Sequence, residues 1–380
     1  MKIKSLFFIF FITPLLISGQ GEKVIFEIEN AINPKSELVI LKDEQPVKIR
    51  TIIDTVIAGK LKIKNAQWKS EQGKIEPLED KLSAKWTPQK QGITSKITFD
   101  FEGNLKIADF GKITYKQIKL SASIILISPI SSKYLKNGEI TGLKIGEYLN
   151  PKDEKSLEEF KITSNWHQIY PEKFSPPTYF YIVTNENKSL KISKHYALGD
   201  FALDYPWYSS GIPQAIALDY GLVEKLEELA DLMNKDGFKF DRFEIIYGFR
   251  PPEFNLGTIL SDGEETLKAP FSQHQYGRAV DIIIDADGDL VMDDINKDGK
   301  IDIYDSAQIL HYVNILDRKY RSQKDAKLGG AGIYTHHDFK GRVQTPYIHI
   351  DTRNFLTEKG YLIRWPEKFP DGSEIDHSKI

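Results

Sequence analysis

Two histidines and one aspartate have the residue types and spacing that can hold a metal ion. His274 precedes Asp281 by seven residues, and the small residues Gly277 and Ala279 let the backbone between them pack closely. Asp281 opens the apolar run 282–284. A carboxylate that enters an apolar run is costly to bury unless it is paired or bound to a metal. His274 and Asp281 are therefore two candidate ligands of one buried site.

The third candidate ligand, His349, lies in a segment that alternates in character. Polar and apolar residues alternate through 347–351, so Tyr347, His349 and Asp351 share one face of the expected strand. Two histidines and one aspartate, with a fourth position open to water, form a catalytic zinc arrangement. Zinc in such a site lowers the pKa of a bound water to about 7 and polarises a carbonyl group. The pattern indicates metal-assisted hydrolysis.

A second set of oxygen ligands lies between these residues, in the acidic stretch 285–305. Residues 294–305 follow the pattern of a calcium loop, with Gly299 at position 6 and Ile301 at position 8. Aspartate at position 12 resembles dockerin-like loops, and the apolar spacing after Ser306 predicts an exit helix. The alternative is a solvated acidic turn. The candidate calcium ligands at positions 1, 3, 5, 7, 9 and 12 are Asp294, Asn296, Asp298, Lys300, Asp302 and Asp305.

A further acidic series, Asp285, Asp287 and Asp289, lacks the glycine that the loop pattern requires, and we do not count it as a site. Calcium in the loop 294–305 is expected to stiffen an insertion beside the metal site and to do no chemistry.

Composition narrows the classes of function. The 380 residues suggest two or three domains, and 41% hydrophobic with 28% charged residues is normal for globular domains with a core. The net charge of −3 gives no reason to expect nucleic-acid binding or a basic membrane patch. Because the chain has no cysteine, disulfides, cysteine nucleophiles and lipid attachment at cysteine are excluded. A metal site must use His, Asp and Glu.

Residues 1–20 have the layout of a secretory signal peptide. Lys2 and Lys4 precede the apolar run 5–18, and the small and polar residues 19–21 follow it. The alternative is a transmembrane anchor, but the run falls short of the ~20 residues that span a bilayer. We therefore predict export to the periplasm or the cell surface, without a stable transmembrane anchor.

The rest of the chain divides into three predicted parts. Alternating runs at 24–28, 97–101 and 118–127 predict an all-β sandwich over 21–128. Within it, Trp86-Thr87-Pro88 followed by Gly92 resembles the later strands of immunoglobulin-like modules in cell-surface proteins; the alternative is a β-domain of unknown role. Prolines punctuate short strand-like pieces in 129–205, which we interpret as a small β linker module.

The final part, 206–380, is predicted to contain both helices and strands. Apolar residues at helical spacing over 222–233 predict a helix, and a strand is expected at 243–247. After Arg250-Pro251-Pro252 we expect a long polar loop.

Four motifs in order across residues 240–366 resemble one family of zinc peptidases. Ser272-x-His274-x-x-Gly277-x-Ala279-x-Asp281, with a later histidine in a strand, is similar to D-alanyl-D-alanine carboxypeptidases, murein endopeptidases and phage endolysins. Their metal-binding domain is shared with the signalling domain of Hedgehog proteins. The other resembling segments are 247–251, 329–334, and 349–353 with 364–365. The resemblance implies an α+β domain with a central antiparallel sheet.

The resemblance also implies roles at matching positions. His274, Asp281 and His349 would be zinc ligands, and Arg250 would bind the carbonyl oxygen as it gains charge, unless it is a surface arginine. Gln273 and Tyr347 are assigned to substrate binding; Gln273 is equally a candidate for a solvated loop residue.

The general base is where this chain departs from the family. Many members carry Glu or His two or three residues before the last ligand, where this chain has Pro346 and Tyr347. Asp351 is the candidate base, and the alternative is that it hydrogen-bonds a ligand imidazole. His336 and His337, expected on a loop over the site, are another route, unless they only solvate that loop.

The resulting expectation is an exported zinc metallopeptidase that hydrolyses peptide bonds in peptidoglycan stem peptides or cross-links. A non-catalytic zinc- and calcium-binding module that binds the cell wall or a partner is the alternative, favoured by the missing base and by the Hedgehog precedent. A third hypothesis is a surface-adhesion protein that acts through its β-domains. It leaves the metal-binding motifs, which occur in the family's order, unexplained.

Overall fold

The computed structural model describes residues 13–15, 23–54, 60–109, 111–160, 166–203, 211–262, 269–339 and 343–365. The chain forms two compact units. The N-terminal unit comprises residues 1–131 with 190–193, and the C-terminal unit comprises 132–189 and 194–380. Except for Thr13–Leu15, the predicted signal peptide lies outside the described residues. Among the described helices, none is long and apolar enough to cross a membrane.

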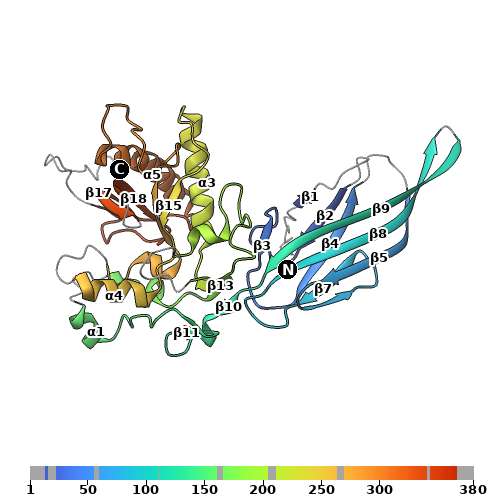
Figure 1. The fold of residues 1–380 in the computed structure, drawn as a ribbon, viewed down its shortest axis with the longest axis horizontal. Helices are drawn as coiled ribbons and strands as arrows, with labels where there is room; N and C mark the ends of the chain where they lie inside the picture. The colour runs from blue at the N-terminus through green and yellow to red at the C-terminus, as the bar shows by residue number, and fades with distance from the viewer. Residues whose placement is uncertain are drawn as a thin grey trace, which may run out of the picture. The chain divides into compact units, whose positions relative to one another are not determined.

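The N-terminal unit consists of two sheets that share one hydrophobic core (Figure 1). One sheet has the strand order β1-β2-β4-β7-β6 and the other β3-β9-β8-β5. In the core the ring of Trp68 lies 4.7 Å from that of Phe99 and 6.4 Å from that of Phe26. The strands of this unit are β1 (Thr13–Leu15), β2 (Lys23–Ile28), β3 (Leu38–Ile40), β4 (Val47–Asp54), β5 (Lys60–Ser70), β6 (Lys74–Pro77), β7 (Ser83–Thr87), β8 (Thr94–Asp109), β9 (Lys112–Ile127) and β10 (Ile130–Ser131).

Alternating side chains explain why these segments form sheets. In β4, Val47, Ile49 and Thr51 are buried while Lys48 and Arg50 are exposed, which is the period of a strand with one face on a core. The three alternating runs predicted as strands are confirmed within β2, β8 and β9. The chain as a whole is a mixed α+β protein built from several open sheets.

The C-terminal unit centres on a sheet with the order β15-β16-β18-β17-β19. The first four strands in this order pair antiparallel, and the edge strand β19 runs parallel to β17. Helix α5 packs on β17 and β18, and α3 packs on α5. The main elements are β13 (Tyr179–Val183), β14 (Gln214–Ile216), α3 (Tyr220–Lys235), β15 (Glu244–Tyr247), α4 (Pro252–Asp262), η5 (Gln273–Tyr276), β16 (Ala279–Ile283), α5 (Ile303–Gln323), β17 (Ala331–Phe339), β18 (Val343–Asp351) and β19 (Arg364–Trp365).

Aspartate side chains cap the N-termini of the two long helices. The Asp219 side chain accepts a hydrogen bond from the backbone amide of Gly221 at 3.0 Å and starts α3. Asp302 and Asp305 form a capping box at the start of α5, so the calcium-loop pattern runs directly into the predicted exit helix. The helix expected over 222–233 and the strand expected over 243–247 are both confirmed.

The loop predicted after Arg250 is wrong over its first part, where α4 forms. Pro252 occupies the first turn of the helix, where a backbone N–H would have no intrahelical acceptor in any case. Phe254 and Ile259 are buried and anchor α4 on the unit. The sequence reading missed this helix because Gly257 and the polar residues around it weaken the apolar pattern.

Most of the stretch predicted as a linker, 129–205, groups with the C-terminal unit. An aromatic cluster of Phe174, Phe271, Tyr276 and Phe355, with Trp166 and Tyr170 packed against it, joins this stretch to the metal-binding region. Its short elements are β11 (Glu139–Ile140), β12 (Leu143–Lys144), α1 (Glu154–Glu159), α2 (Trp166–Ile169) and the 3-10 turns η1 (Ser132–Tyr134), η2 (Pro171–Phe174) and η3 (Leu198–Phe201). The domain boundaries themselves stay predictions.

Candidate metal centre

The structure brings the three predicted ligands together from three elements. Asp281 in β16 stands directly opposite His349 in β18 in the antiparallel register, and His274 comes from η5, just before β16. The turn between η5 and β16 requires glycine at position 277. Gly277 has φ +67°, and a Cβ there would lie 2.3 Å from the carbonyl oxygen of Ala217.

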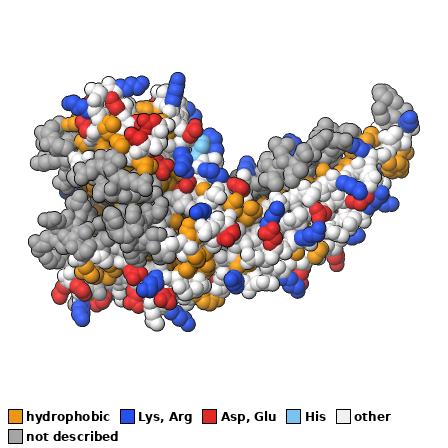
Figure 2. All heavy atoms as spheres, in the orientation of Figure 1, with side chains coloured by type: hydrophobic (Ala, Val, Ile, Leu, Met, Phe, Trp, Pro, Cys, Tyr) orange, Lys and Arg blue, Asp and Glu red, His pale blue; other side chains and the backbone are white. Residues whose placement is uncertain are grey.

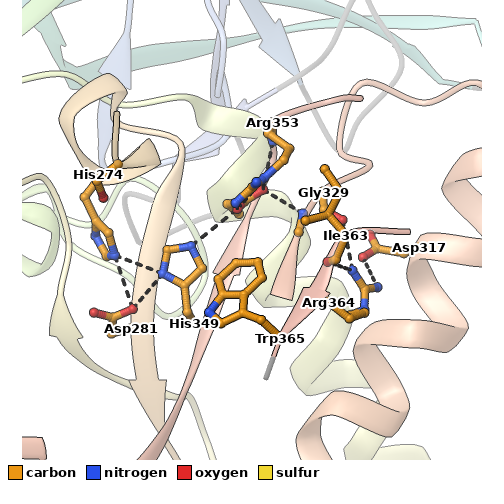
Figure 3. Close-up of polar contacts among 12 residues, drawn as sticks. His274, Asp281, Asp317, Gly329, His349, Arg353, Ile363, Arg364 and Trp365 are labelled. Atoms are coloured by element: carbon orange, nitrogen blue, oxygen red, sulfur yellow. Dashed lines mark hydrogen bonds and ion pairs between the residues drawn. The ribbon is translucent and has the colours of Figure 1, made fainter. Parts of the chain in front are cut away.

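Three potential ligand atoms form a tight triangle (Figure 3). Nε2 of His274 lies 3.2 Å from Oδ1 of Asp281 and 3.1 Å from Nδ1 of His349. Nδ1 of His349 lies 2.8 Å from the same Oδ1. The residues are 0%, 4% and 7% exposed in the order His274, Asp281, His349, so water does not separate these atoms.

The outer hydrogen bonds fix which ring nitrogens face the triangle. Nδ1 of His274 lies 2.7 Å from the carbonyl oxygen of Gly248, which can only accept, so Nδ1 carries the proton. Nε2 of His349 lies 3.3 Å from the Asp351 carboxylate and likewise donates. In the neutral rings the two nitrogens that remain, Nε2 of His274 and Nδ1 of His349, present lone pairs toward Asp281. Two lone pairs and a carboxylate oxygen repel one another unless a cation lies among them.

The pKa directions show where a proton would compete with a cation for the triangle. Burial, with the nearby charge of Arg250, lowers the pKa of His274 to about 4, so that ring stays neutral near pH 7. Burial lowers the pKa of His349, but hydrogen bonds to Asp281 and Asp351 outweigh it and raise the pKa above the ordinary value. Burial raises the pKa of Asp281, but the two imidazoles outweigh it and hold the carboxyl well below its usual range. The site is thus electron-rich and holds an ionised carboxylate.

The triangle fits a tetrahedral zinc ion. With ligand distances of about 2.0–2.1 Å, two ligands of a tetrahedral ion lie about 3.3 Å apart. The three observed separations, 2.8–3.2 Å, are close to that edge length. The group His274, Asp281 and His349 can therefore bind a metal ion. Three protein ligands would leave the fourth position of a tetrahedral ion to water or substrate.

Asp351 is saturated by its own partners. Its Oδ1 accepts from the backbone amides of Gly330 at 2.7 Å and Arg353 at 3.0 Å, and the Arg353 guanidinium pairs with both oxygens. Burial raises the pKa of Asp351, but Arg353 and His349 outweigh it and hold the pKa well below the usual range. Of the two roles open to Asp351, these contacts favour orientation of the His349 ring over proton transfer.

Arg250 lies buried beside the triangle and keeps free hydrogen-bonding capacity. Its Nη2 donates to the Ser272 hydroxyl at 3.0 Å, and its guanidinium lies 5.8 Å from the ring of Tyr247. Arg250 is 8% exposed, and its Nε has no partner among the described residues. Gln273 is 4% exposed, and its Oε1 is likewise unpartnered. A buried polar atom without a partner costs about 1–3 kcal/mol, so both atoms suit an absent ligand.

Aromatic rings form one wall of the site. Tyr347 stacks on Tyr334 with ring centroids 4.5 Å apart and an interplanar angle of 2°. The Tyr334 hydroxyl accepts from Trp365 Nε1 at 2.6 Å, and the Trp365 ring lies 5.2 Å from that of His349. Burial, with the charge of Asp281, raises the pKa of Tyr347 and of Tyr334, so both phenols stay protonated and can donate.

A buried ionic network behind the site was missed by the sequence reading. Lys225 on α3 is fully buried and donates to Asp317 at 2.7 Å and to the backbone carbonyl of Asp351 at 3.1 Å. Arg364 in β19 donates to the other oxygen of Asp317 at 2.7 Å and to the carbonyl of Gly329 at 3.1 Å. The available signal was Lys225 itself, a charged residue three positions after Leu222 on the apolar face of the helix.

The loop 294–305 is closed by hydrogen bonds from backbone amides to its own carboxylates. Asp294 accepts from Gly299 at 2.8 Å, Asp298 from Lys300 at 2.9 Å, and Asp305 from Ile295 at 2.9 Å and Asp302 at 2.9 Å. Gly299 has φ +85°, as the turn at position 6 requires.

The series Asp285, Asp287 and Asp289, which was not counted as a site, does cluster, whereas the described carboxylates of 294–305 form no such group. One carboxylate oxygen from each lies within 4.8 Å of the others. These side chains are mostly exposed, an arrangement that is common without an ion.

The loop expected at His336 and His337 is wrong, because both residues lie in β17. Their side chains lie outside the part of the structure that is described, so they are assigned no role.

Comparison of the chain with models of known protein families, with curated proteins and with solved structures gave no match.

Proposed function

We propose that this protein is a zinc-dependent peptidase acting on peptide bonds of peptidoglycan. The observation that carries the proposal is the convergence of two imidazole nitrogens and one carboxylate oxygen in a buried triangle. Zinc is favoured because the donor set is two histidines and one aspartate, which is typical of catalytic zinc sites. When bound, zinc would polarise the scissile carbonyl and activate water for attack.

The side chains around the triangle have separable tasks under this proposal. Asp351 holds the His349 ring so that Nδ1 faces the ion. Arg250 has an unpartnered donor with which to bind the carbonyl oxygen as it gains charge. Gln273 supplies an unpartnered acceptor for a substrate amide, and the Tyr347 phenol is a donor at the aromatic wall. No Glu or His stands at the position of the family's base, so we assign no general base.

The proposal includes the finer structural expectations. The C-terminal unit would be a Hedgehog-type peptidase domain, and the N-terminal unit an immunoglobulin-like sandwich. The loop 294–305 would bind a structural calcium ion, and residues 1–20 would direct export to the periplasm or cell surface. The resemblance of motifs and the two-sheet core support these statements.

Digestion of purified peptidoglycan tests the proposal. The wild-type chain with added zinc should release stem peptides or cross-link fragments, seen by mass spectrometry. His349→Ala should release none, because it removes a ligand. His311→Ala, which changes an exposed histidine on α5, is the matched control and should digest like wild type. Identical products from wild type and His349→Ala would refute the peptidase assignment.

The second candidate is a module that binds zinc and calcium without catalysis. The saturation of Asp351 and the lack of a base before His349 favour it. It predicts that zinc binds to the triangle while peptidoglycan remains intact in the same assay, and that the chain sediments with peptidoglycan.

A further inference from the structure

The free end of the β5–β8–β9 sheet in the N-terminal unit carries an excess of positive charge. We define this distal ribbon as residues 60–64 of β5, 104–109 of β8 and 112–117 of β9. It has a single acidic residue, Asp109, which stands opposite Lys112 in the register. The whole-chain charge of −3 conceals this local excess. The exposed lysines of the ribbon are Lys60, Lys62, Lys64, Lys106 and Lys112.

The outward face of the ribbon places like charges side by side. Lys60 stands directly opposite Lys106, which in turn stands opposite Tyr115 on the next strand. Like charges directly opposite each other on neighbouring strands are destabilising. Within the described ranges, the side chains of Lys60, Lys62 and Lys106 form no hydrogen bond or ion pair with another residue. Farther along this face the acidic residues are paired: Asp100 with Lys69 at 2.8 Å and Glu102 with Lys119 at 4.0 Å.

The same face exposes large apolar side chains. Tyr115 is 67% exposed and Ile113 is 52% exposed. Tyr115 stands directly opposite Lys106, and Ile113 lies two residues before it, so both side chains are on the same face of the sheet as Lys106. Orange and blue side chains lie together at the free end of this hairpin in Figure 2. Elsewhere on the visible face of the unit, charges of both signs are interspersed.

We infer that the distal ribbon is a docking surface for a membrane that contains anionic phospholipids. Lysines are attracted to such a surface by about 1 kcal/mol each, and an amphipathic tyrosine with a neighbouring isoleucine suits the headgroup boundary. A soluble polyanion would satisfy the lysines but would leave Ile113 and Tyr115 in water. The combination of unpaired lysines with exposed apolar side chains therefore selects the lipid surface. This surface is independent of the metal centre and of the proposed peptidase activity.

Sedimentation of the full chain with vesicles tests the inference. The chain should bind vesicles made of equal parts phosphatidylcholine and phosphatidylglycerol, and it should bind vesicles of pure phosphatidylcholine much more weakly. The double variant Lys60→Gln/Lys106→Gln should lower the partition coefficient for the anionic vesicles about 30-fold. The double variant Ile113→Ser/Tyr115→Ser should lower it about tenfold or more.

The matched control is Lys48→Gln/Lys85→Gln. These lysines are also exposed and directly opposite each other, in β4 and β7 of the other sheet. Lys48 interacts electrostatically with Asp80 and Lys85 with Glu76, so their removal should leave vesicle binding unchanged. Melting temperatures of the variants should not fall below that of wild type, because each substituted side chain is exposed.

Three results would overturn the inference. One is an absence of binding to the anionic vesicles by the wild-type chain. Another is equal loss of binding in the control and in the lysine variant. The third is full retention of binding by Ile113→Ser/Tyr115→Ser, which would show a charge-only surface for polyanions and would refute docking on a membrane.

Discussion

The contact between Asp351 and His349 makes the most discriminating prediction about the site. In Asp351→Asn one amide oxygen remains to accept from Gly330 and Arg353, and the amide nitrogen turns toward Nε2 of His349, which lies 3.3 Å from the native carboxylate. Two donors then face each other. The ring must lose this hydrogen bond or change tautomer, and a change of tautomer places a proton on Nδ1, in the position of the metal.

Loss of such an outer partner lowers metal affinity by about 10–100-fold, or about 1.4–2.8 kcal/mol. The assay is competition for zinc against a chromophoric chelator, with the apo chain checked by circular dichroism for an unchanged fold. Asp231→Asn, an exposed position on α3, is the control and should bind zinc like wild type. If Asp351 were instead the general base, the substitution would abolish turnover and leave zinc affinity within about twofold of wild type, a result that would refute our assignment.

Three further predictions concern the same region. Zinc affinity should fall by about tenfold per pH unit as the pH drops below the raised pKa of His349, because the ion competes there with one proton. His274, with its pKa of about 4, adds a second proton only near that pH. A zinc affinity that does not change between pH 8 and pH 5 would contradict this prediction. Arg250→Met should lower kcat/KM on peptidoglycan fragments by about 10²–10³ with zinc affinity unchanged, and equal kinetics in both enzymes would remove Arg250 from the mechanism. Calcium added at 100 times its dissociation constant should stabilise the metal-depleted chain by about 2.7 kcal/mol, seen as a higher melting temperature, and should not stabilise Asp294→Ala; equal shifts in both chains would rule out the loop.

The grouping of His274, Asp281 and His349 could be predicted because the sequence signals for it are local. Asp281 precedes an apolar run, which predicts that its side chain is buried. The alternation around His349 predicts which face of the strand its side chain occupies. The antiparallel pairing that sets Asp281 against His349 is a long-range contact that no local pattern reveals. The tautomer of His274 could not be predicted from the sequence. Its ring donates to the backbone carbonyl of Gly248, and no side-chain pattern reveals that contact.

Elements whose pattern is weak or non-local were the ones missed. Helix α4 begins at Pro252 and contains Gly257, two residues that are typical of loops, so it was predicted as a loop. His336 and His337 lie in β17 because this strand pairs with β18. The pairing depends on the partner strand and is not visible in the residues around the two histidines. The ion pair between Lys225 and Asp317 joins residues that are 92 positions apart, and only their burial in one core connects them.

The most direct test of the metal centre is anomalous scattering at the zinc edge from crystals of the full chain. We predict one peak in the triangle, about 2.0–2.2 Å from Nε2 of His274, Nδ1 of His349 and Oδ1 of Asp281. The peak should be absent in crystals of Asp281→Ala grown in the same zinc concentration. A wild-type chain without a peak at this position, or an Asp281→Ala chain that retains it, would contradict the assignment of these three residues as ligands.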